Sequence, residues 1–216
     1  ICSAPYSAVY TTKQPRVYCS RCKKPQLTCY CSHLQPFSSA LRFVILMHPF
    51  ESKRSIATGR MAHLSLPNSI LYEGLDFSTH RGVKAILKDP QNFCAVLSPK
   101  HGSTNLSVLS PEKRRALFPL DKTLTLFVID GTWAQARRMI RLSRNLHRLP
   151  MVCFTPETPS RFLVRQQPEE HFLSTIEAIH TCISLLSPQP ADSLLVPFAH
   201  MVNQQVEFEM ANAALR

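Results

Sequence analysis

The stretch LFVIDGTWAQARRMIR, residues 126 to 141, contains the clearest structural signal in this sequence. Its apolar start is typical of a buried strand, and that run ends at Asp130. Gly131 permits a tight turn, and Thr132 is a preferred N-cap for the helix that the next residues predict. Ligands of open α/β sheets bind at the carboxyl ends of strands, so Asp130 stands where a ligand contact is expected. The alternative is an Asp that only hydrogen-bonds the turn.

Arginines follow one side of the helix predicted after this turn. At about 100° per residue, Arg137, Arg141 and Arg144 share a stripe next to the apolar stripe that begins with Trp133. Asp and Glu are missing from residues 132–155, whereas solvated faces usually mix both signs. We therefore expect these arginines to bind nucleic-acid phosphates, with a solvated charged face as the alternative.

Strand-like and helix-like segments alternate on both sides of the turn. In chain order we expect strand 41–47, helix 52–64, strand 69–72, helix 80–89, strand 92–98, loop 110–118, strand 124–129, a helix from 132, strand 150–154, and helices 172–186 and 196–213. Such alternation predicts an α/β fold with a mostly parallel sheet flanked by helices.

Composition limits the classes of protein that need to be considered. The 216 residues carry 25 Lys and Arg against 14 Asp and Glu, a formal net charge of +11. This excess favours a polyanionic partner, with ordinary solubility charge as the alternative. No run reaches the roughly 20 apolar residues of a membrane helix, and the first residues lack a secretory signal pattern. We expect a cytoplasmic protein that does not enter a membrane.

Four of the eight cysteines lie within thirteen residues. Cys19 and Cys22 form a C-x-x-C pair, and Cys29 and Cys31 form a C-x-C pair after six residues. Four thiolates fill the tetrahedral shell of one ion, which predicts a structural site, most simply for zinc. An iron-sulfur cluster and disulfides are the alternatives. Residues 1–40 are therefore predicted to be an N-terminal segment with a four-cysteine zinc module.

The turn at Asp130 is also a family signature. Asp130-Gly131-Thr132-Trp133 matches the D-x-T-W motif of the DTW-domain family, and from Tyr18 onward the chain resembles its bacterial tRNA-uridine aminocarboxypropyltransferases. The agreement covers four blocks in the same order. They are Cys19-Ser20-Arg21-Cys22 with Cys29-Tyr30-Cys31, Thr58-Gly59-Arg60, Asp130 to Trp133 with Ala136-Arg137, and Ser160, Phe162, Arg165 with Ser174, Thr175, Glu177.

The chain also departs from the family pattern. Ala57 stands in place of a favoured Asn, Ala134-Gln135 replaces Pro-Glu, and Phe162 replaces a common Tyr.

The resemblance implies a SPOUT-like catalytic domain over residues 41–216 that binds S-adenosylmethionine, with a knot near the C-terminus as a further expectation. It implies transfer of the 3-amino-3-carboxypropyl group to N3 of a tRNA uridine, at position 47 of the variable loop, with release of methylthioadenosine. An RNA methyltransferase of the same broad fold and a non-catalytic zinc-bearing RNA-binding protein are the alternatives.

The resemblance also assigns roles to residues. Asp130 is expected to be catalytic, as the base for the N3 proton or its hydrogen-bond acceptor, with binding of the cofactor's amino group as its rival role. Arg60 or Arg165 is expected to clamp the carboxylate of the transferred group. The residues expected to bind S-adenosylmethionine are Thr58, Arg60, Ile129, Thr132, Trp133, Phe154, Phe162, Arg165, Ser174, Thr175 and Glu177.

Overall fold

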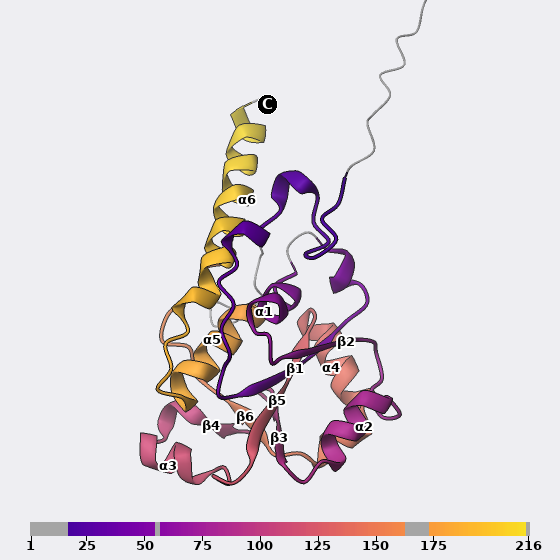
Figure 1. The fold of residues 1–216 in the computed structure, drawn as a ribbon, viewed down its shortest axis with the longest axis vertical. Coiled ribbons are helices and arrows are strands. Elements are labelled where there is room, and N and C mark those ends of the chain that lie inside the picture. Colours follow the sequence, from indigo (N-terminus) through magenta and orange to yellow (C-terminus); the bar gives the residue numbers. More distant parts are fainter. Residues whose placement is uncertain (1–16, 55–56, 163–172, 215–216) are drawn as a thin grey trace, which may run out of the picture.

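A six-stranded sheet lies at the centre of the computed structural model, which describes residues 17–54, 57–162 and 173–214 (Figure 1). Its strand order is β2-β1-β5-β3-β6-β4, and each neighbouring pair runs parallel. The strands are β1 (Arg42–Met47), β2 (Ile70–Glu73), β3 (Asn92–Leu97), β4 (Thr104–Asn105), β5 (Thr123–Asp130) and β6 (Met151–Cys153). The predicted mostly parallel α/β sheet is confirmed.

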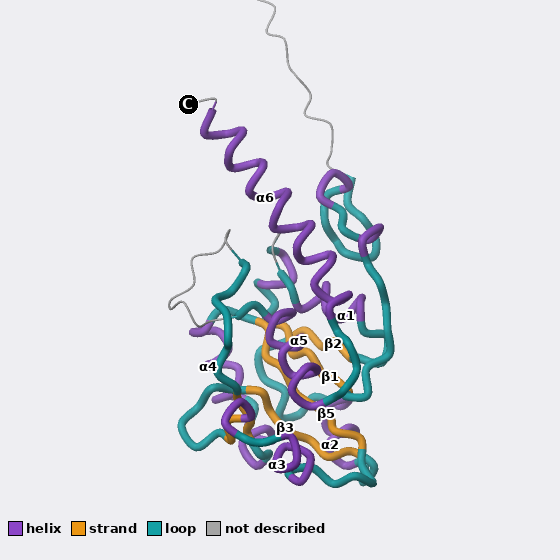
Figure 2. The backbone as a smooth tube through the Cα atoms, turned by 90° about the vertical axis from the view of Figure 1, so that its left-hand side faces the viewer, coloured by secondary structure: helices purple, strands orange, loops and turns teal. Residues whose placement is uncertain are grey.

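Helices cover both faces of this sheet (Figure 1, Figure 2). The α-helices are α1 (Gly59–Ser65), α2 (Arg81–Lys88), α3 (Pro111–Ala116), α4 (Trp133–Leu142), α5 (Thr175–Leu186) and α6 (Val196–Ala214). Short 3-10 helices are η1 (Gln26–Thr28), η2 (Cys31–His33), η3 (Glu51–Lys53), η4 (Leu106–Val108), η5 (Arg144–Arg148) and η6 (Asp192–Leu195). No helix in the described ranges combines the length and apolar character that a membrane span requires.

Successive residues of β1 point into two separate cores. Phe43 and Ile45 lie in the core that α1, α5 and α6 cover, called here the α1-side core. Val44 and Leu46 lie in the core that α2 and α4 cover, the α2-side core. Side chains alternate across a strand with period two, so a continuous apolar run is what a strand covered on both faces requires.

The cysteine-rich segment packs against the α1-side core. Cys22 and Tyr30 are fully buried within that core. His33 of η2 stacks on His200 of α6, with ring centroids 3.7 Å apart. Beyond this contact α6 extends away from the body of the molecule (Figure 2). The segment is thus joined to the sheet domain by buried contacts, and the division predicted after residue 40 stays a prediction.

The helix expected at 52–64 is shorter than predicted. After β1 the chain forms only the single turn η3, and Arg54 is extended. Glu51 is fully buried at the start of that turn, and its carboxylate pairs with Arg54 Nε at 3.4 Å. The backbone thus leaves the helical conformation at Arg54, and α1 begins only at Gly59.

One other local prediction was wrong, and one short strand was not predicted. Residues 110–118, expected as a loop, contain α3. The Ser110 hydroxyl accepts a hydrogen bond from Lys113 N, and Pro111 occupies the first turn, both of which are helix-start signals. The two-residue strand β4 was not predicted, because it is too short to show a period.

The sheet has a topological switch point between β1 and β5. The chain leaves β1 towards β2 on one side, and leaves β5 towards β6 on the other. Such a point opens a crevice beyond the carboxyl ends of the two strands, where ligands of α/β sheets bind. Met47 and Asp130, the last residues of β1 and β5, lie opposite each other there. The knot expected near the C-terminus falls on a region that includes 163–172, outside the described residues.

Candidate active site

Three of the sequence blocks meet at Asp130. The Asp130 side chain is 4% exposed at the end of β5. Thr175, the first residue of α5, donates a hydrogen bond from Oγ1 to Asp130 Oδ1 at 2.6 Å. Gly59, the first residue of α1, approaches so closely that a Cβ atom there would lie 2.6 Å from Asp130 Cγ. The carboxylate is therefore held on the α1 side of the switch point.

The turn after Asp130 starts α4 with a capping box. Thr132 Oγ1 accepts a hydrogen bond from Gln135 N at 3.3 Å, and Gln135 Oε1 accepts one from Thr132 N at 2.7 Å. Gln135 thus keeps the reciprocal bonds that a Glu would make at this position. Trp133 is half-buried at the first position of the helix. The N-terminus of α4 therefore lies directly beside Asp130, the last residue of β5.

Glu177 joins α5 to the 160–162 segment. Its Oε2 accepts hydrogen bonds from Ser160 Oγ at 2.8 Å, Ser174 N at 2.8 Å and Ser174 Oγ at 2.6 Å. Its Oε1 accepts one from Arg161 N at 2.8 Å. One carboxylate therefore accepts four donors, and it fixes the segment beside the N-terminus of α5 and hence beside Thr175.

Other predicted cofactor residues lie in the cores around the site. Phe162 is 2% exposed and packs edge-on against Phe198 of α6, with ring centroids 5.5 Å apart. Ile129 packs with the α2-side core, and Phe154 packs with the α1-side core. Arg165 lies outside the described residues. Ile129, Phe154 and Phe162 therefore pack with core residues.

The block before α1 lies close to Asp130. Thr58 is buried and its carbonyl oxygen accepts a hydrogen bond from Ala62 N at 3.0 Å. Arg60 is half-buried one residue after the Gly59 contact. Its guanidinium lies near enough to Lys24 and Tyr30 to influence the pKa of each. Arg60 thus places a cation on the side of the site that faces the cysteine-rich segment.

His48 is a site residue that was not predicted from the sequence. It directly follows β1, and its backbone N donates to Asp130 O at 2.8 Å. Its ring Nδ1 accepts from Phe50 N at 3.1 Å, which puts the proton of the neutral ring on Nε2. Burial lowers the pKa of His48, so the ring is neutral at neutral pH. A polar residue ending a buried strand was the available signal, the same one that marked Asp130.

Lys24 is a second site residue that was not predicted from the sequence. Its side chain is 5% exposed, and Nζ donates to Arg54 O at 3.0 Å. Burial lowers the pKa of Lys24 to about 8, while the negative charges of Cys22, Asp130 and Glu51 oppose that shift. The cysteine-rich segment therefore contributes a buried cation to the surroundings of Asp130.

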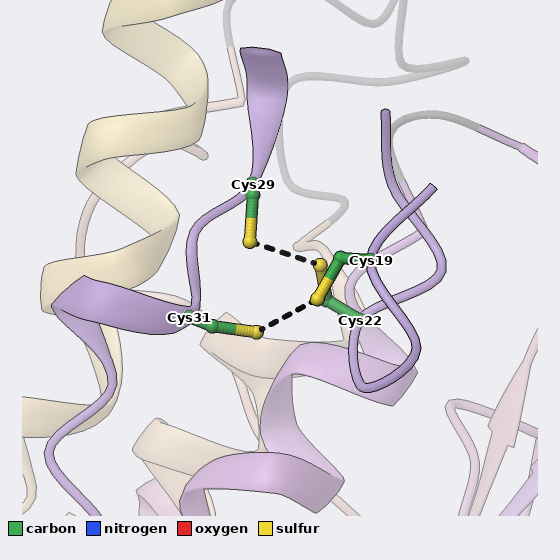
Figure 3. Close-up of side chains that lie close together, drawn as sticks. All are labelled: Cys19, Cys22, Cys29 and Cys31. Atoms are coloured by element: carbon green, nitrogen blue, oxygen red, sulfur yellow. Dashed lines mark hydrogen bonds between the residues drawn. The ribbon is translucent and has the colours of Figure 1, made fainter. Parts of the chain in front are cut away.

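The four cysteines lie close enough together to hold one metal ion (Figure 3). All four sulfur atoms lie within 4.8 Å of one another. Cys19 and Cys31 are 3.7 Å apart, and Cys22 and Cys29 are 3.6 Å apart. A tetrahedral ion with bonds of about 2.3 Å to sulfur needs sulfur atoms about 3.8 Å apart, so the cluster fits.

The local backbone favours the thiolate form of Cys19, whereas burial opposes it at Cys31. Lys23 adopts a left-handed conformation with φ of 61°, which turns the chain between the first cysteine pair and the rest. Backbone amides of Cys22 and Arg21 donate to the Cys19 sulfur and lower its pKa to about 6. Burial raises the pKa of the Cys31 thiol. Four thiolates this close together need a bound cation for charge balance.

The predicted arginine stripe is divided between two elements. Arg137 and Arg141 are exposed on α4, but α4 ends at Leu142 and Arg144 lies in η5. The helix ends there because Ser143 is buried, with its hydroxyl accepting a hydrogen bond from Phe77 N. The expectation of one continuous helical stripe through Arg144 was therefore wrong, although all three arginines remain exposed.

Comparison with known proteins agrees with this geometry. A family model, the DTW domain, matches residues 16–206. A tRNA-uridine aminocarboxypropyltransferase 2 of Drosophila melanogaster is 35% identical over 179 residues, which cover 80% of this chain and 67% of that protein. Its Mus musculus counterpart is 29% identical over 202 residues, covering 89% of this chain and 64% of the relative.

A plant relative extends the comparison. The tRNA-uridine aminocarboxypropyltransferase A of Arabidopsis thaliana is 25% identical over 198 residues, covering 80% of this chain and 74% of that protein. The chain spans about two thirds of the length of the fly and mouse relatives. No solved structure matches it. These relatives are animal and plant proteins, so the resemblance is not specific to bacterial members. The match over most of the chain shows that the protein belongs to the DTW domain family.

Proposed function

We propose that this protein is a tRNA-uridine aminocarboxypropyltransferase. It would move the 3-amino-3-carboxypropyl group of S-adenosylmethionine to N3 of a uridine. The observation that carries the proposal is the convergence of Gly59, Thr175 and Asp130 at the switch point. The shared name of the fly, mouse and plant relatives supports the same reaction.

The charges around the site suit the donor. An amino acid group carries an ammonium and a carboxylate, and its recognition needs an anion and a cation side by side. Arg60 and Lys24 supply cations for the carboxylate, and Asp130 would pair with the ammonium in the alternative to the role as base proposed below. Thr58, Thr132, Trp133, Ser174 and Thr175 then form the nearest walls. In this proposal Ile129, Phe154, Phe162 and Glu177 support those walls, and Arg165 stays a predicted carboxylate ligand.

The reaction demands alignment and removal of one proton. A bond forms between uridine N3 and the γ-carbon, the carbon–sulfur bond breaks, and methylthioadenosine leaves with the bonding electrons. The N3 proton passes to a base, for which we propose Asp130. Thr175 orients the carboxylate through its bond to Oδ1, and the close approach of Gly59 limits its movement. Fixed geometry of this kind is the main contribution an enzyme makes when the leaving group is already activated.

We propose a structural role for the metal centre, with zinc as the ion. Cys19, Cys22, Cys29 and Cys31 supply four ligands and leave no position for water. The ion would hold the loop that carries Lys24.

The RNA would lie along Arg137, Arg141 and Arg144. Replacing both helical arginines, Arg137→Ala with Arg141→Ala, should weaken tRNA binding and lower the slope of log affinity against log salt by about 1 for each lost phosphate contact. Arg115→Ala, on exposed α3, is the matched control. A slope equal to that of the wild-type protein would remove these arginines from the proposed interface.

The function is tested by mass spectrometry of nucleosides. Unmodified tRNA is incubated with the protein and S-adenosylmethionine, and we expect aminocarboxypropyl-uridine together with methylthioadenosine. Nuclease mapping then tests position 47, which rests on the bacterial members alone. A methylated nucleoside with S-adenosylhomocysteine would show a methyltransferase, and bound tRNA without turnover would show a binding protein.

Asp130→Asn separates the two roles of the carboxylate. The amide preserves the shape of the side chain but accepts no proton. We expect S-adenosylmethionine to bind with little change while product formation is lost, measured by calorimetry and by nucleoside analysis. Loss of donor binding would instead assign Asp130 to the ammonium group, and unimpaired transfer would exclude both roles.

A further inference from the structure

An exposed aromatic ring lies beside the proposed reaction centre. Phe50, two residues after His48 at the end of β1, is 65% exposed. Its ring centroid is 5.3 Å from that of His48, with the planes tilted by 48°. Single exposed apolar residues are ordinary on protein surfaces, so exposure alone carries no meaning. What distinguishes Phe50 from other exposed residues is its position near Asp130.

The turn that presents Phe50 is fixed by hydrogen bonds. Phe50 N donates to His48 Nδ1 at 3.1 Å, and Glu51 N donates to His48 O at 2.9 Å. Ser52 Oγ contacts Pro49 O at 2.8 Å and an oxygen of the Glu73 carboxylate at the end of β2 at 2.9 Å. The backbone under the ring is therefore held from two strands, and the ring projects from a fixed turn.

The turn that carries Phe50 is joined directly to the Asp130–Gly131 turn at the end of β5. His48 N donates to Asp130 O at 2.8 Å, and the His48 Cβ lies 3.5 Å from the position that a Cβ would take at Gly131. Phe50 is therefore presented by a turn that is hydrogen-bonded to the backbone of Asp130. Thr175 and Gly59 contact the Asp130 side chain from the α1 side of the switch point.

Two arginines lie near His48, against which the Phe50 ring packs. Arg54, which follows η3, and Arg138, exposed on α4, both lie near enough to His48 to act on its charge. The nearby acid Glu51 is fully buried and paired with Arg54 Nε at 3.4 Å. The surface around Phe50 therefore offers an aromatic face with positive charge beside it, which is the chemistry of single-stranded RNA recognition.

The geometry of the transfer adds a direction. In a displacement at carbon the nucleophile enters opposite the leaving group, so uridine and adenosine must lie on opposite sides of the moving carbon. The donor walls proposed above come from the starts of α1, α4 and α5. Phe50 and Arg138 lie outside those walls and near His48, so they are available to meet the uridine. An enzyme that acts on a base takes it out of its stack and needs a new surface for it.

We propose that Phe50 is the stacking platform for the target uracil, with Arg54 and Arg138 binding the flanking phosphates. The inference rests on the proposed function and names the place where its RNA substrate is recognised. Because any base offers a π-face, the ring binds the uracil without selecting it. Selection of uridine then falls to groups that meet its N3 edge, Asp130 among them.

The experiment compares Phe50→Ala with Phe50→Trp. Stacking of one base contributes enough that we expect Phe50→Ala to raise the KM for tRNA roughly 5- to 100-fold, with the S-adenosylmethionine Kd within about twofold of the wild-type value. Phe50→Trp restores the ring and should keep the KM within about threefold of wild type. The matched control is Leu120→Ala, which should change neither constant. Leu120 is 86% exposed and precedes the amino end of β5, whereas Phe50 follows the carboxyl end of β1.

The outcomes are distinguishable. A weaker S-adenosylmethionine Kd with an unchanged tRNA KM would assign the ring to adenine and overturn the proposal. Wild-type constants for Phe50→Ala would reduce the ring to an exposed side chain and overturn it as well. If the wild-type protein forms no product, the proposed function fails by itself. The tRNA Kd then tests the ring, and an unchanged value for Phe50→Ala overturns the inference.

Discussion

At the residue scale, the site depends on the missing side chain of Gly59. A methyl group there would lie 2.6 Å from Asp130 Cγ, so Gly59→Ala must displace either α1 or the carboxylate. We expect a loss of about 1–3 kcal/mol of stability. We also expect a fall in turnover of about 100-fold, because catalytic groups tolerate little displacement. Chemical denaturation and the nucleoside assay measure the two effects.

A double-mutant cycle tests the cause of that loss. An Asp130→Gly background removes the three Asp130 atoms that lie nearest to a Cβ at residue 59. Gly59→Ala should then change stability by less than about 0.5 kcal/mol. An equal loss in both backgrounds would show that the methyl group clashes elsewhere.

His63 on α1 predicts a pH dependence of stability. Burial, and next the charge of Arg60, lower the pKa of His63 below its usual 6.5, and its Nδ1 lies 2.8 Å from Ser69 Oγ. The unfolded chain therefore binds more protons than the folded chain once the pH drops below 6.5. Stability is fully present above that value and falls as the pH drops towards the folded pKa.

Denaturation midpoints at about pH 7.5 and about pH 5.5 measure this loss. His63→Gln should lose less stability over that interval than the wild-type protein does. His101→Gln, on an exposed turn, should keep the wild-type dependence. An identical loss in all three proteins would assign the effect to other groups.

Single residues were predictable where the signal is local. Asp130 was found because a polar residue ends an apolar run, and Thr132 because capping residues precede helices. His48 carried the same strand-end signal and was overlooked. The burial of Lys24 depends on contacts with Arg54, thirty positions away, and no local pattern reports such a contact.

At the element scale, Glu177 is the connection between α5 and the 160–162 segment. Glu177→Gln replaces an acceptor of four hydrogen bonds by an amide that presents its own donors to them. We expect a loss of roughly 2–4 kcal/mol of stability and weaker S-adenosylmethionine binding. Urea denaturation and calorimetry measure these changes. Glu209→Gln, exposed on α6, should stay within about 0.5 kcal/mol. An unchanged S-adenosylmethionine affinity in Glu177→Gln would show that the 160–162 segment does not contribute to donor binding.

Helices and strands lie where the sequence predicts them when they carry their own start and stop signals. β1, β5 and the start of α4 lie where the apolar runs and the cap predicted them. The end of α4 was not predictable in this way. It is set by the hydrogen bond from Phe77 N to Ser143 Oγ, which joins residues 66 positions apart. Helix ends determined by tertiary contacts leave no local trace.

At the scale of the whole molecule, the metal centre and the catalytic domain are expected to lose stability together. Cys22 is a metal ligand candidate and also a member of the α1-side core. Cys22→Ser should abolish stoichiometric metal binding and lower the thermal midpoint of the entire protein. Metal analysis and calorimetry measure both. Cys94→Ser, outside the cluster, should keep its metal. A Cys22→Ser protein with a wild-type midpoint would show that the centre is thermally independent of the sheet.

The fold class was predictable from alternation, whereas the strand order was not. Parallel strands pair through crossover connections, and nothing in the local pattern of β1 shows that its second neighbour is β5. The position of the switch point follows from that strand order, and so does the expected place of ligand binding. The activity was inferred from the family resemblance, because periodicity indicates a fold but not a function.

The contact between the cysteine-rich segment and α6 has a consequence for the order in which the protein matures on the ribosome. The segment is synthesised before the sheet, yet His33 stacks on His200, near the end of the chain. The β1–β5 pair likewise joins residues some eighty positions apart. Contacts so distant in sequence slow folding. The thiols therefore leave the ribosome well before their packing partners, and metal capture during translation would protect them from oxidation until the last helix arrives.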